Sequence, residues 1–305
     1  MIKLDPNIAW ERVAEPQADL SDVEILLKVA HDLYGYTPQT PAPGSATMMG
    51  GRVEIKMAPE MHYDNIVRIT QEQLDQEPII ENLEHIISLT SYYETIAEFL
   101  DAFHPTCWKA AEQNRVGYGC ACGPMGSPER GKIEVQSTCA HLTAGGDGLT
   151  HEVWHQRMHA LGIDFETHQG LLFENADDEV YDSPIRKDKP RPMPAVIQAQ
   201  YSYIGVTDFY RTIIDRLFSD NRDLAEYRGL QVNLQSYLHT NARNVLRIRE
   251  GVDTIRTHLR PTPDIGERYF QGYMNYAQRV IDQSIEQLKF YENKNNTQYD
   301  WGPRI

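Results

Sequence analysis

The chain has 305 residues, of which 41% are hydrophobic and 24% are charged. This balance is typical of a folded globular protein with a sizeable core. The formal net charge of -15 gives no reason to expect binding to nucleic acid or to an anionic membrane surface. No segment approaches the run of about 18 apolar residues that a membrane span needs. With four cysteines and no recognisable export signal, we expect a cytoplasmic protein with reduced thiols.

The first 130 residues predict a mainly helical region. Residues 21–24 (SDVE) have the pattern of a capping box, and the helix that follows is expected to end at Gly35. Alternating apolar and charged residues over 53–57 predict a short, half-buried strand. Residues 64–103 predict two amphipathic helices. We expect this region to recognise the substrate or its leader segment.

The second half of the chain alternates between irregular and regular segments. Gly145, Gly146 and Gly148 are expected to break the chain before a helix. The remaining segments are predicted as follows: irregular over 117–131, extended over 132–142, irregular over 181–194, and helical over 194–295 with breaks near 219–222 and 260–265. We therefore expect a mainly α protein with a small β-sheet (α+β), built as one compact unit. Its catalytic, metal-binding region would cover 131–295 and its tail 296–305.

Residues 151–155 read His-Glu-Val-Trp-His, an HExxH motif. On a helix, His151 and His155 fall one turn apart on one face, so both imidazoles can bind one metal ion with Glu152 beside them. The other faces of this helix are apolar, which predicts that the helix is buried and that its histidines face a metal or a polar cavity. His159 lies about 12 Å along the axis from His151, so one ion cannot easily bind all three histidines. His159 would support a ligand, face the substrate or be a core histidine with its own partner.

The HExxH motif is typical of zinc peptidases, in which Glu152 would be the general base that activates a metal-bound water. The metzincin extension requires glycine and histidine where this chain has Met158 and Leu161. A gluzincin site requires a downstream glutamate, and Glu174 has suitable spacing but lies in a polar, turn-like stretch. His168 is another candidate for the third ligand. A zinc peptidase therefore stays an alternative, and a protein that binds a partner with zinc in a structural role, or with no metal, is a third hypothesis.

Downstream of the motif, residues 186–191 (RKDKPR) carry four cations in a strongly acidic protein. Neighbouring prolines stiffen this segment into an extended shape. Guanidinium groups bind carboxylates with two parallel hydrogen bonds, so the segment is a candidate anchor for a small anionic ligand. Pro194 is well placed to begin a helix, and Gln198 follows among apolar residues, where its amide needs a buried partner.

The motif and this downstream segment together resemble a known family. LTHEVWHQRMHAL followed by SPIRKDKPRP and VIQAQYSYIGVTDFY is similar to the HExxH-type peptide-modifying enzymes of ribosomally made natural-product pathways. The resemblance covers about residues 140–215, roughly a quarter of the chain. The chain departs from the family pattern at Ala199, where glycine is usual, and has one extra residue between Asp188 and Arg191.

The resemblance implies an iron- and 2-oxoglutarate-dependent dioxygenase that hydroxylates a side-chain β-carbon of a precursor peptide. Fe(II) and 2-oxoglutarate would be its cofactors, with zinc in the alternative, and a ribosomally made peptide would be its substrate. It implies that His151 and His155 bind the metal together with Gln198, or with His168, and that Glu152 ligates the metal or supports a ligand. Arg191 or Arg186 would then bind the distal carboxylate of 2-oxoglutarate.

Overall fold

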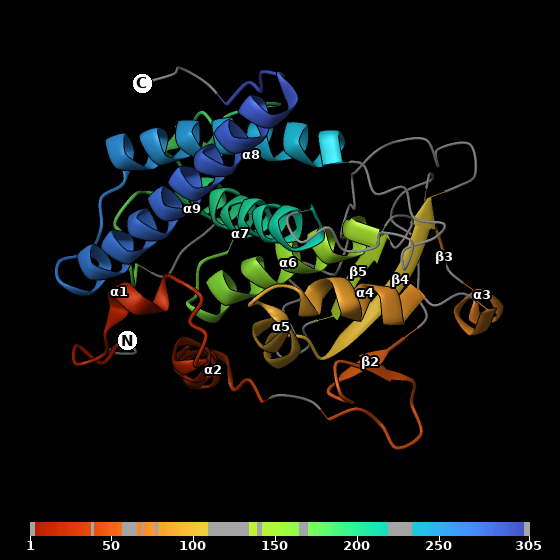
Figure 1. The fold of residues 1–305 in the computed structure, drawn as a ribbon. Coiled ribbons are helices and arrows are strands. Elements are labelled where there is room, and N and C mark those ends of the chain that lie inside the picture. Colours follow the sequence, from red (N-terminus) through yellow and green to blue (C-terminus); the bar gives the residue numbers. More distant parts are fainter. Residues whose placement is uncertain are drawn as a thin grey trace.

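The computed structural model describes residues 4–37, 40–56, 66–68, 70–76, 79–108, 134–138, 142–164, 170–218 and 234–301. Helices dominate these residues and a small sheet lies to one side of them (Figure 1). The prediction of a mainly α protein with a small β-sheet is therefore confirmed. The predicted irregular segment 117–131 and the candidate ligand His168 lie outside the described residues.

The N-terminal part begins with helices and continues into short strands: α1 (Trp10–Val13), α2 (Ser21–Tyr34), β1 (Thr47–Met48), β2 (Val53–Ile55), β3 (Ile66–Arg68), α3 (Gln71–Gln76), α4 (Ile79–Ser88) and α5 (Tyr93–Phe99). Helix α2 ends as predicted, because Gly35 adopts the left-handed conformation with φ 69°. The capping box does not form. Leu20 takes the N-cap position, and the Ser21 hydroxyl instead donates to Asp19.

The prediction of two helices over 64–103 was too simple, since this stretch holds β3, three helices and the start of β4 (Ala102–Trp108). Strand β4 is the centre of the sheet. One edge of β4 pairs in parallel with β5 (Glu134–Thr138). The other edge pairs with two strands, with β2 in parallel and with β3 in antiparallel orientation. The strands predicted at 53–57 and 132–142 are thus confirmed by β2 and β5. The segment 181–194 is not wholly irregular, because β6 (Val180–Tyr181) and β7 (Arg191–Pro192) form a small ribbon.

Four long helices form the rest of the core: α6 (Leu142–Ala160), α7 (Met193–Phe218), α8 (Leu234–His258) and α9 (Ile265–Asn295). The gap between α8 and α9 matches the predicted break at 260–265, whereas the break near 219–222 lies outside the described residues. Helix α6 packs on α7, and α7 also packs on α8 and α9 (Figure 1). The N-terminal elements contact the same bundle, with α2, α4 and α5 against α6 and α1 against α9.

The predicted break before the HExxH helix was wrong, because α6 runs through Gly145, Gly146 and Gly148 without interruption. Tertiary packing explains the glycine at position 146. A Cβ atom there would lie 2.5 Å from the ring of Phe209, so glycine is what allows α6 and α7 to approach closely. Packing outweighs the weak helix propensity of glycine at this point.

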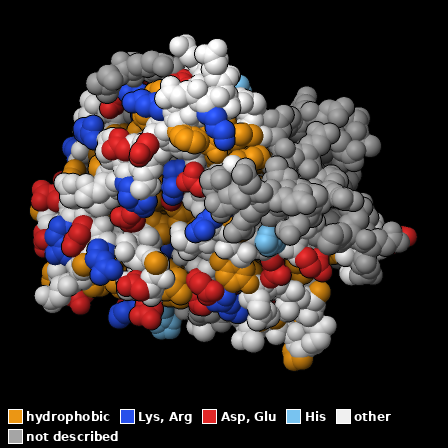
Figure 2. All heavy atoms as spheres, viewed as in Figure 1, with side chains coloured by type: hydrophobic (Ala, Val, Ile, Leu, Met, Phe, Trp, Pro, Cys, Tyr) orange, Lys and Arg blue, Asp and Glu red, His pale blue; other side chains and the backbone are white. Residues whose placement is uncertain are grey.

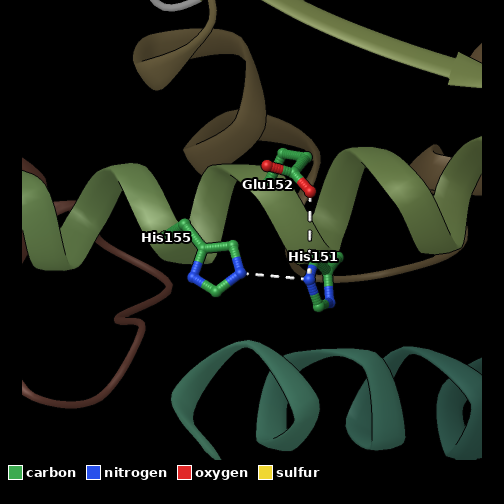
Figure 3. Close-up of side chains that lie close together, drawn as sticks. All are labelled: His151, Glu152 and His155. Atoms are coloured by element: carbon green, nitrogen blue, oxygen red, sulfur yellow. Dashed lines mark hydrogen bonds and ion pairs between the residues drawn. The ribbon is translucent and has the colours of Figure 1, made fainter. Parts of the chain in front are cut away.

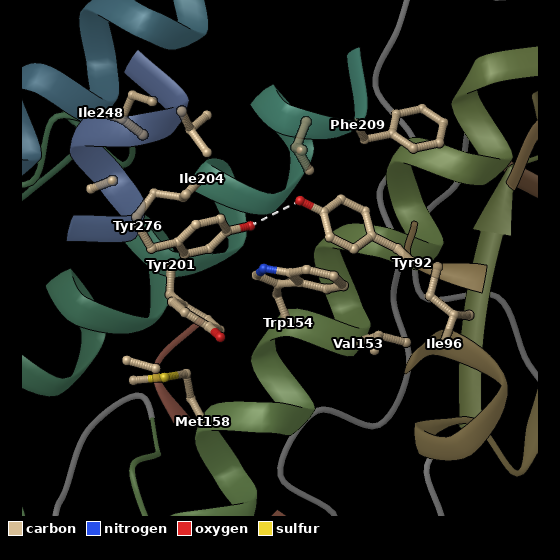
Figure 4. Close-up of a cluster of buried hydrophobic side chains, with 14 of the residues drawn as sticks. Tyr92, Ile96, Val153, Trp154, Met158, Tyr201, Ile204, Phe209, Ile248 and Tyr276 are labelled. Atoms are coloured by element: carbon tan, nitrogen blue, oxygen red, sulfur yellow. Dashed lines mark hydrogen bonds between the residues drawn. The ribbon is translucent and has the colours of Figure 1, made fainter. Parts of the chain in front are cut away.

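The apolar faces of α6 are buried, as its sequence predicts. Val153, Trp154 and Met158 are fully buried and point into the aromatic cluster drawn in Figure 4. The Trp154 indole meets the ring of Tyr92 edge-on at 4.7 Å and lies 6.5 Å from the ring of Tyr201. The HExxH helix is therefore held rigidly on its apolar sides, which leaves only its polar face available for chemistry.

A buried ion pair fixes α6 to the N-terminal part. The Arg157 guanidinium donates to the carboxylate of Asp22 on α2 and also to the hydroxyl of Tyr201, 3.2 Å from its Nε. Both charged side chains are almost fully buried, with 1% and 0% exposed. The ring of Phe99 lies beside the same guanidinium, 5.7 Å from its Cζ.

Substitution of Gly205 by alanine is expected to loosen the packing behind the motif. The new Cβ would lie 2.6 Å from Nε1 of Trp154, so the indole or helix α7 must shift. Overpacking of this kind costs about 1 to 3 kcal/mol of unfolding free energy, which urea denaturation would measure. Gly205 lies inside α7, where alanine is otherwise the better helix former. An unchanged or raised unfolding free energy in Gly205→Ala would therefore contradict the packing argument.

Charges of both signs are interspersed over the face of the molecule shown in Figure 2. None of the described helices has both the length and the apolar character needed to cross a membrane.

Candidate metal centre

One turn of α6 brings three potential metal ligands together (Figure 3). His151, Glu152 and His155 each offer one ligand atom, and these atoms lie within 4.8 Å of one another. The Nε2 atoms of the two histidines are 3.0 Å apart, and Oε1 of Glu152 is 3.8 Å from Nε2 of His151. Two ligands on one ion with bonds of about 2.1 Å lie about 3.0 to 3.4 Å apart. The spacing of the two imidazoles therefore suits one divalent transition-metal ion, whereas the Glu152 oxygen lies outside this range.

The surroundings of these side chains favour neutral imidazoles. Although 29% of the His151 side chain is open, the protein packed around the ring lowers the pKa of His151 to about 4. Burial also lowers the pKa of His155 well below its usual range, and the neighbouring His151 adds to this effect. Neutral imidazole is the form that binds metals. The carboxyl group of Glu152, which is only 3% exposed, lies beside them.

Gln198 of α7 orients His155 from behind. The Nδ1 atom of His155 lies 2.9 Å from Oε1 of Gln198, whose Nε2 donates to the carbonyl oxygen of Ile163. Because an amide oxygen can only accept, the hydrogen of the neutral ring is assigned to Nδ1, which leaves the Nε2 lone pair facing His151. The sequence correctly indicated that this glutamine needs a buried partner.

The same geometry favours a supporting role for Gln198 over the metal-ligand role that the resemblance implies. Its oxygen lies on the side of the imidazole away from His151, so it does not reach an ion held between the two Nε2 atoms. Gln198 is a positioning residue in this arrangement. The carboxylate of Glu152, rather than the amide, is the third ligand atom that the structure brings close to the histidines.

Replacement of Gln198 by leucine is expected to weaken metal binding about 10- to 100-fold, because the His155 ring loses the group that sets its orientation and tautomer. Competition titration with a chromophoric chelator and Co(II) would measure the affinity. Gln278, an exposed glutamine on α9, provides the matched control as Gln278→Leu. Wild-type Co(II) affinity in Gln198→Leu would show that His155 needs no support from α7.

The remaining predicted residues are not part of this cluster. His159 is close enough to His155 to contribute to its lowered pKa and is half-buried on the same face of α6. Glu174 is exposed, and its backbone N–H donates to Arg260, so the gluzincin arrangement gains no support. His168 lies outside the part of the chain that the structure describes.

The two arginines expected to bind 2-oxoglutarate both contact Asp188. Arg191 donates to both of its carboxylate oxygens at 2.9 and 2.7 Å, and Nε of Arg186 lies 3.8 Å from the same group. Arg186 and Asp188 line a surface hollow of about 420 Å³ between the 182–190 segment and α8. Neither arginine contacts the HExxH cluster within the described residues.

Two groups beside the cluster were not foreseen from the sequence. The ring of Tyr203 meets that of His151 edge-on, with centroids 5.8 Å apart. Nη1 of Arg247 on α8 donates to the Tyr203 hydroxyl at 3.2 Å. The positions of Tyr203 and Arg247 in the sequence hardly predict that they lie beside His151, because these contacts depend on how α6, α7 and α8 pack against one another.

Asp147 lies one turn before His151 and accepts a hydrogen bond of 3.0 Å from the Tyr210 hydroxyl. Burial raises the pKa of Asp147 to about 6, despite the opposing effects of Tyr210 and Arg243. Because this pKa is above the value near 3.8 expected in the unfolded chain, the folded state is favoured at low pH. That advantage is lost as the pH rises through about 6.

Asp147→Asn removes this titration and keeps an acceptor for Tyr210. Its unfolding free energy relative to wild type should therefore rise between pH 4 and pH 7, by about 2 to 3 kcal/mol. Urea unfolding at a series of pH values would measure the difference. A difference that stays constant with pH would mean that the pKa of Asp147 is the same in the folded and unfolded states.

Comparison with known proteins adds no identity to this geometry. No protein-family model matches the chain, and no curated protein matches it significantly. The chemistry of the cluster is therefore argued from its own residues.

Proposed function

We propose that this protein is an Fe(II)- and 2-oxoglutarate-dependent oxygenase that hydroxylates a side-chain β-carbon of a peptide. One observation carries the proposal: two neutral imidazole nitrogens 3.0 Å apart lie beside a buried carboxylate on one turn of a buried helix. Two histidines and one carboxylate form the donor set of non-haem iron oxygenases, which leaves coordination positions open for a cosubstrate and O₂. The resemblance of residues 140–215 to peptide hydroxylases supports the peptide substrate.

In this proposal His151, His155 and Glu152 hold the metal, and Gln198 keeps the proton of His155 on Nδ1. Bound iron would supply the activation of O₂. Overall, a C–H group, 2-oxoglutarate and O₂ give a C–OH group, succinate and CO₂. The buried Val153 and Trp154 exclude water from the rear of the cluster, and among the described residues it is the His151 side chain that opens to solvent. Fe(II) chemistry suits a reducing compartment, and we place the protein in the cytoplasm.

The decisive experiment uses protein loaded anaerobically with Fe(II) and titrated with 2-oxoglutarate. The proposal expects a new absorption band on binding and, after O₂ is admitted, one succinate per 2-oxoglutarate consumed. A random-sequence peptide pool should accelerate this conversion and gain oxygen by mass spectrometry. Iron-loaded protein that neither binds 2-oxoglutarate nor forms succinate would rule the proposal out.

A zinc peptidase is the second candidate, and one distance favours it. Oε1 of Glu152 is 3.8 Å from Nε2 of His151, which also suits a general base beside a metal-bound water. Glu152→Gln separates the two candidates. A peptidase would keep its metal and lose peptide cleavage, whereas an oxygenase that uses Glu152 as a ligand would lose metal affinity. Absence of turnover with any metal would favour the third hypothesis, of a partner-binding protein.

A further inference from the structure

Helices α6, α7 and α8 present chemically related side chains in two successive layers. One turn separates the layers on α6 and α8, and two turns separate them on α7. The first layer contains an acid, a tyrosine and an arginine, and the second replaces the acid by a histidine of the candidate metal centre. The layers are Asp147, Tyr210 and Arg243, followed by His151, Tyr203 and Arg247.

The first layer is balanced in charge. Asp147 accepts a hydrogen bond from Tyr210, and Arg243 is close enough to favour its ionised form. One acid and one base therefore compensate each other at the centre of the three-helix packing, so this layer has no need of a ligand.

In the second layer the carboxyl group of Glu152 lies against His151, and no carboxylate pairs with Arg247 in the part of the chain that the structure describes. Arg247 is half-buried and contacts Tyr203 in two ways, through the hydrogen bond to the hydroxyl and through a distance of 5.8 Å from Cζ to the ring centroid. No acidic side chain pairs with it among the described residues, although the sequence has 44 acidic residues against 29 basic ones. A partly desolvated guanidinium without a counter-ion is costly, and an anion bound there would remove that cost.

Three of the four cations in the 186–191 segment have acidic partners. Arg191 and Arg186 share Asp188, and Lys187 lies 3.3 Å from Glu250. Arg247 differs from them in its position as well, since its guanidinium and the His151 imidazole contact the same Tyr203 ring. The Tyr203 side chain therefore links Arg247 to the metal centre.

We propose that Arg247, held by Tyr203, binds a carboxylate of a molecule that occupies the metal centre. This inference rests on the proposed function only in requiring that the centre bind metal and a ligand. The carboxylate could come from two sources, the distal end of a small 2-oxo diacid or an acidic group of the peptide. The two carboxyl carbons of an extended 2-oxoglutarate are about 5 Å apart, so one end can bind a metal while the other reaches a neighbouring side chain.

The test uses the full chain loaded with Co(II), with Arg247→Gln as the variant and calorimetry as the readout. If the small diacid is the source, 2-oxoglutarate should bind the variant about 10- to 100-fold more weakly. The affinity of 2-oxobutanoate, which lacks the distal carboxylate, should not change. If the peptide is the source, wild type should prefer a random peptide pool over the same pool with esterified carboxyl groups, and the variant should lose that preference.

Two further variants distinguish a specific loss of carboxylate binding from a general loss of folded protein. Arg256→Gln changes an exposed arginine on the same helix and should bind every probe as wild type does. Tyr203→Phe removes only the hydroxyl that holds Arg247, so it should cause the same loss to a smaller extent.

Normal binding of both carboxylate probes to Arg247→Gln would overturn the inference, whatever the enzymatic activity. Conversely, carboxylate binding that depends on Arg247 would stand even if no succinate were formed, which is the outcome that removes the proposed oxygenase. Failure of the inference and failure of the proposed function are therefore distinguishable.

Discussion

His155→Ala is expected to reduce metal affinity by more than about 100-fold, a greater loss than that expected of Gln198→Leu. The substitution removes one of the two Nε2 atoms that lie 3.0 Å apart, and it also separates the cluster from Gln198. A single imidazole and a carboxylate on one helical turn do not enclose an ion. Equilibrium dialysis against Co(II) or Fe(II), followed by elemental analysis, would measure the loss.

Substitution of a second histidine, away from the candidate metal centre, is the control for general effects of replacing histidine by alanine. His258 at the end of α8 stacks on Tyr181, with ring centroids 5.0 Å apart, and is exposed. His258→Ala should therefore retain the metal content of wild type. Stoichiometric metal in a folded His155→Ala variant would mean that the ion binds elsewhere and that the HExxH turn is not the centre.

The largest effect on stability is expected from Asp22→Ala, which should lower the unfolding free energy by about 3 to 5 kcal/mol. Burial opposes the charge of Arg157, but Tyr201 and Asp22 outweigh it and hold the pKa of the guanidinium above its usual range. Removal of Asp22 thus leaves a buried cation with its main partner missing. Urea denaturation followed by circular dichroism would measure the change.

The double variant Asp22→Leu with Arg157→Met tests the cause of this loss. If an uncompensated charge is responsible, replacing both partners by apolar residues should destabilise the protein less than Asp22→Ala does. Asp32, which pairs with Lys28 on the exposed side of α2, gives the surface control. Asp32→Ala should change the unfolding free energy by less than about 0.5 kcal/mol. A double variant less stable than Asp22→Ala would assign the loss to packing.

Apolar periodicity was a good guide to the long helices, because their buried faces repeat with the helical period. It located α2, the buried faces of α6 and the helical stretch that contains α7, α8 and α9. Local signals failed where distant contacts outweighed them. Gly146 signalled a chain break, yet it lies within α6 because Phe209 packs against it. Ser21 signalled a cap, yet its hydroxyl binds Asp19.

The residues of the candidate site also differ in how far the sequence alone predicts them. His151, Glu152 and His155 could be found from the sequence because their closeness follows from the helical repeat alone. Gln198 was recognised as a buried amide in need of a partner, but its place behind His155 depends on how α7 packs against α6. The contact between Arg247 and Tyr203 joins positions 44 residues apart and has no local pattern.

All three candidate ligand atoms come from one turn of one helix, whereas the groups that surround them come from α7 and α8. In the proposed function, metal binding and ligand choice would therefore be specified by separate stretches of the chain, so that substitutions could accumulate in one without disturbing the other. A lineage that keeps the HExxH turn can exchange its substrates by changing α7 and α8. Searches for proteins of related chemistry should accordingly compare these two helices as well as the HExxH motif.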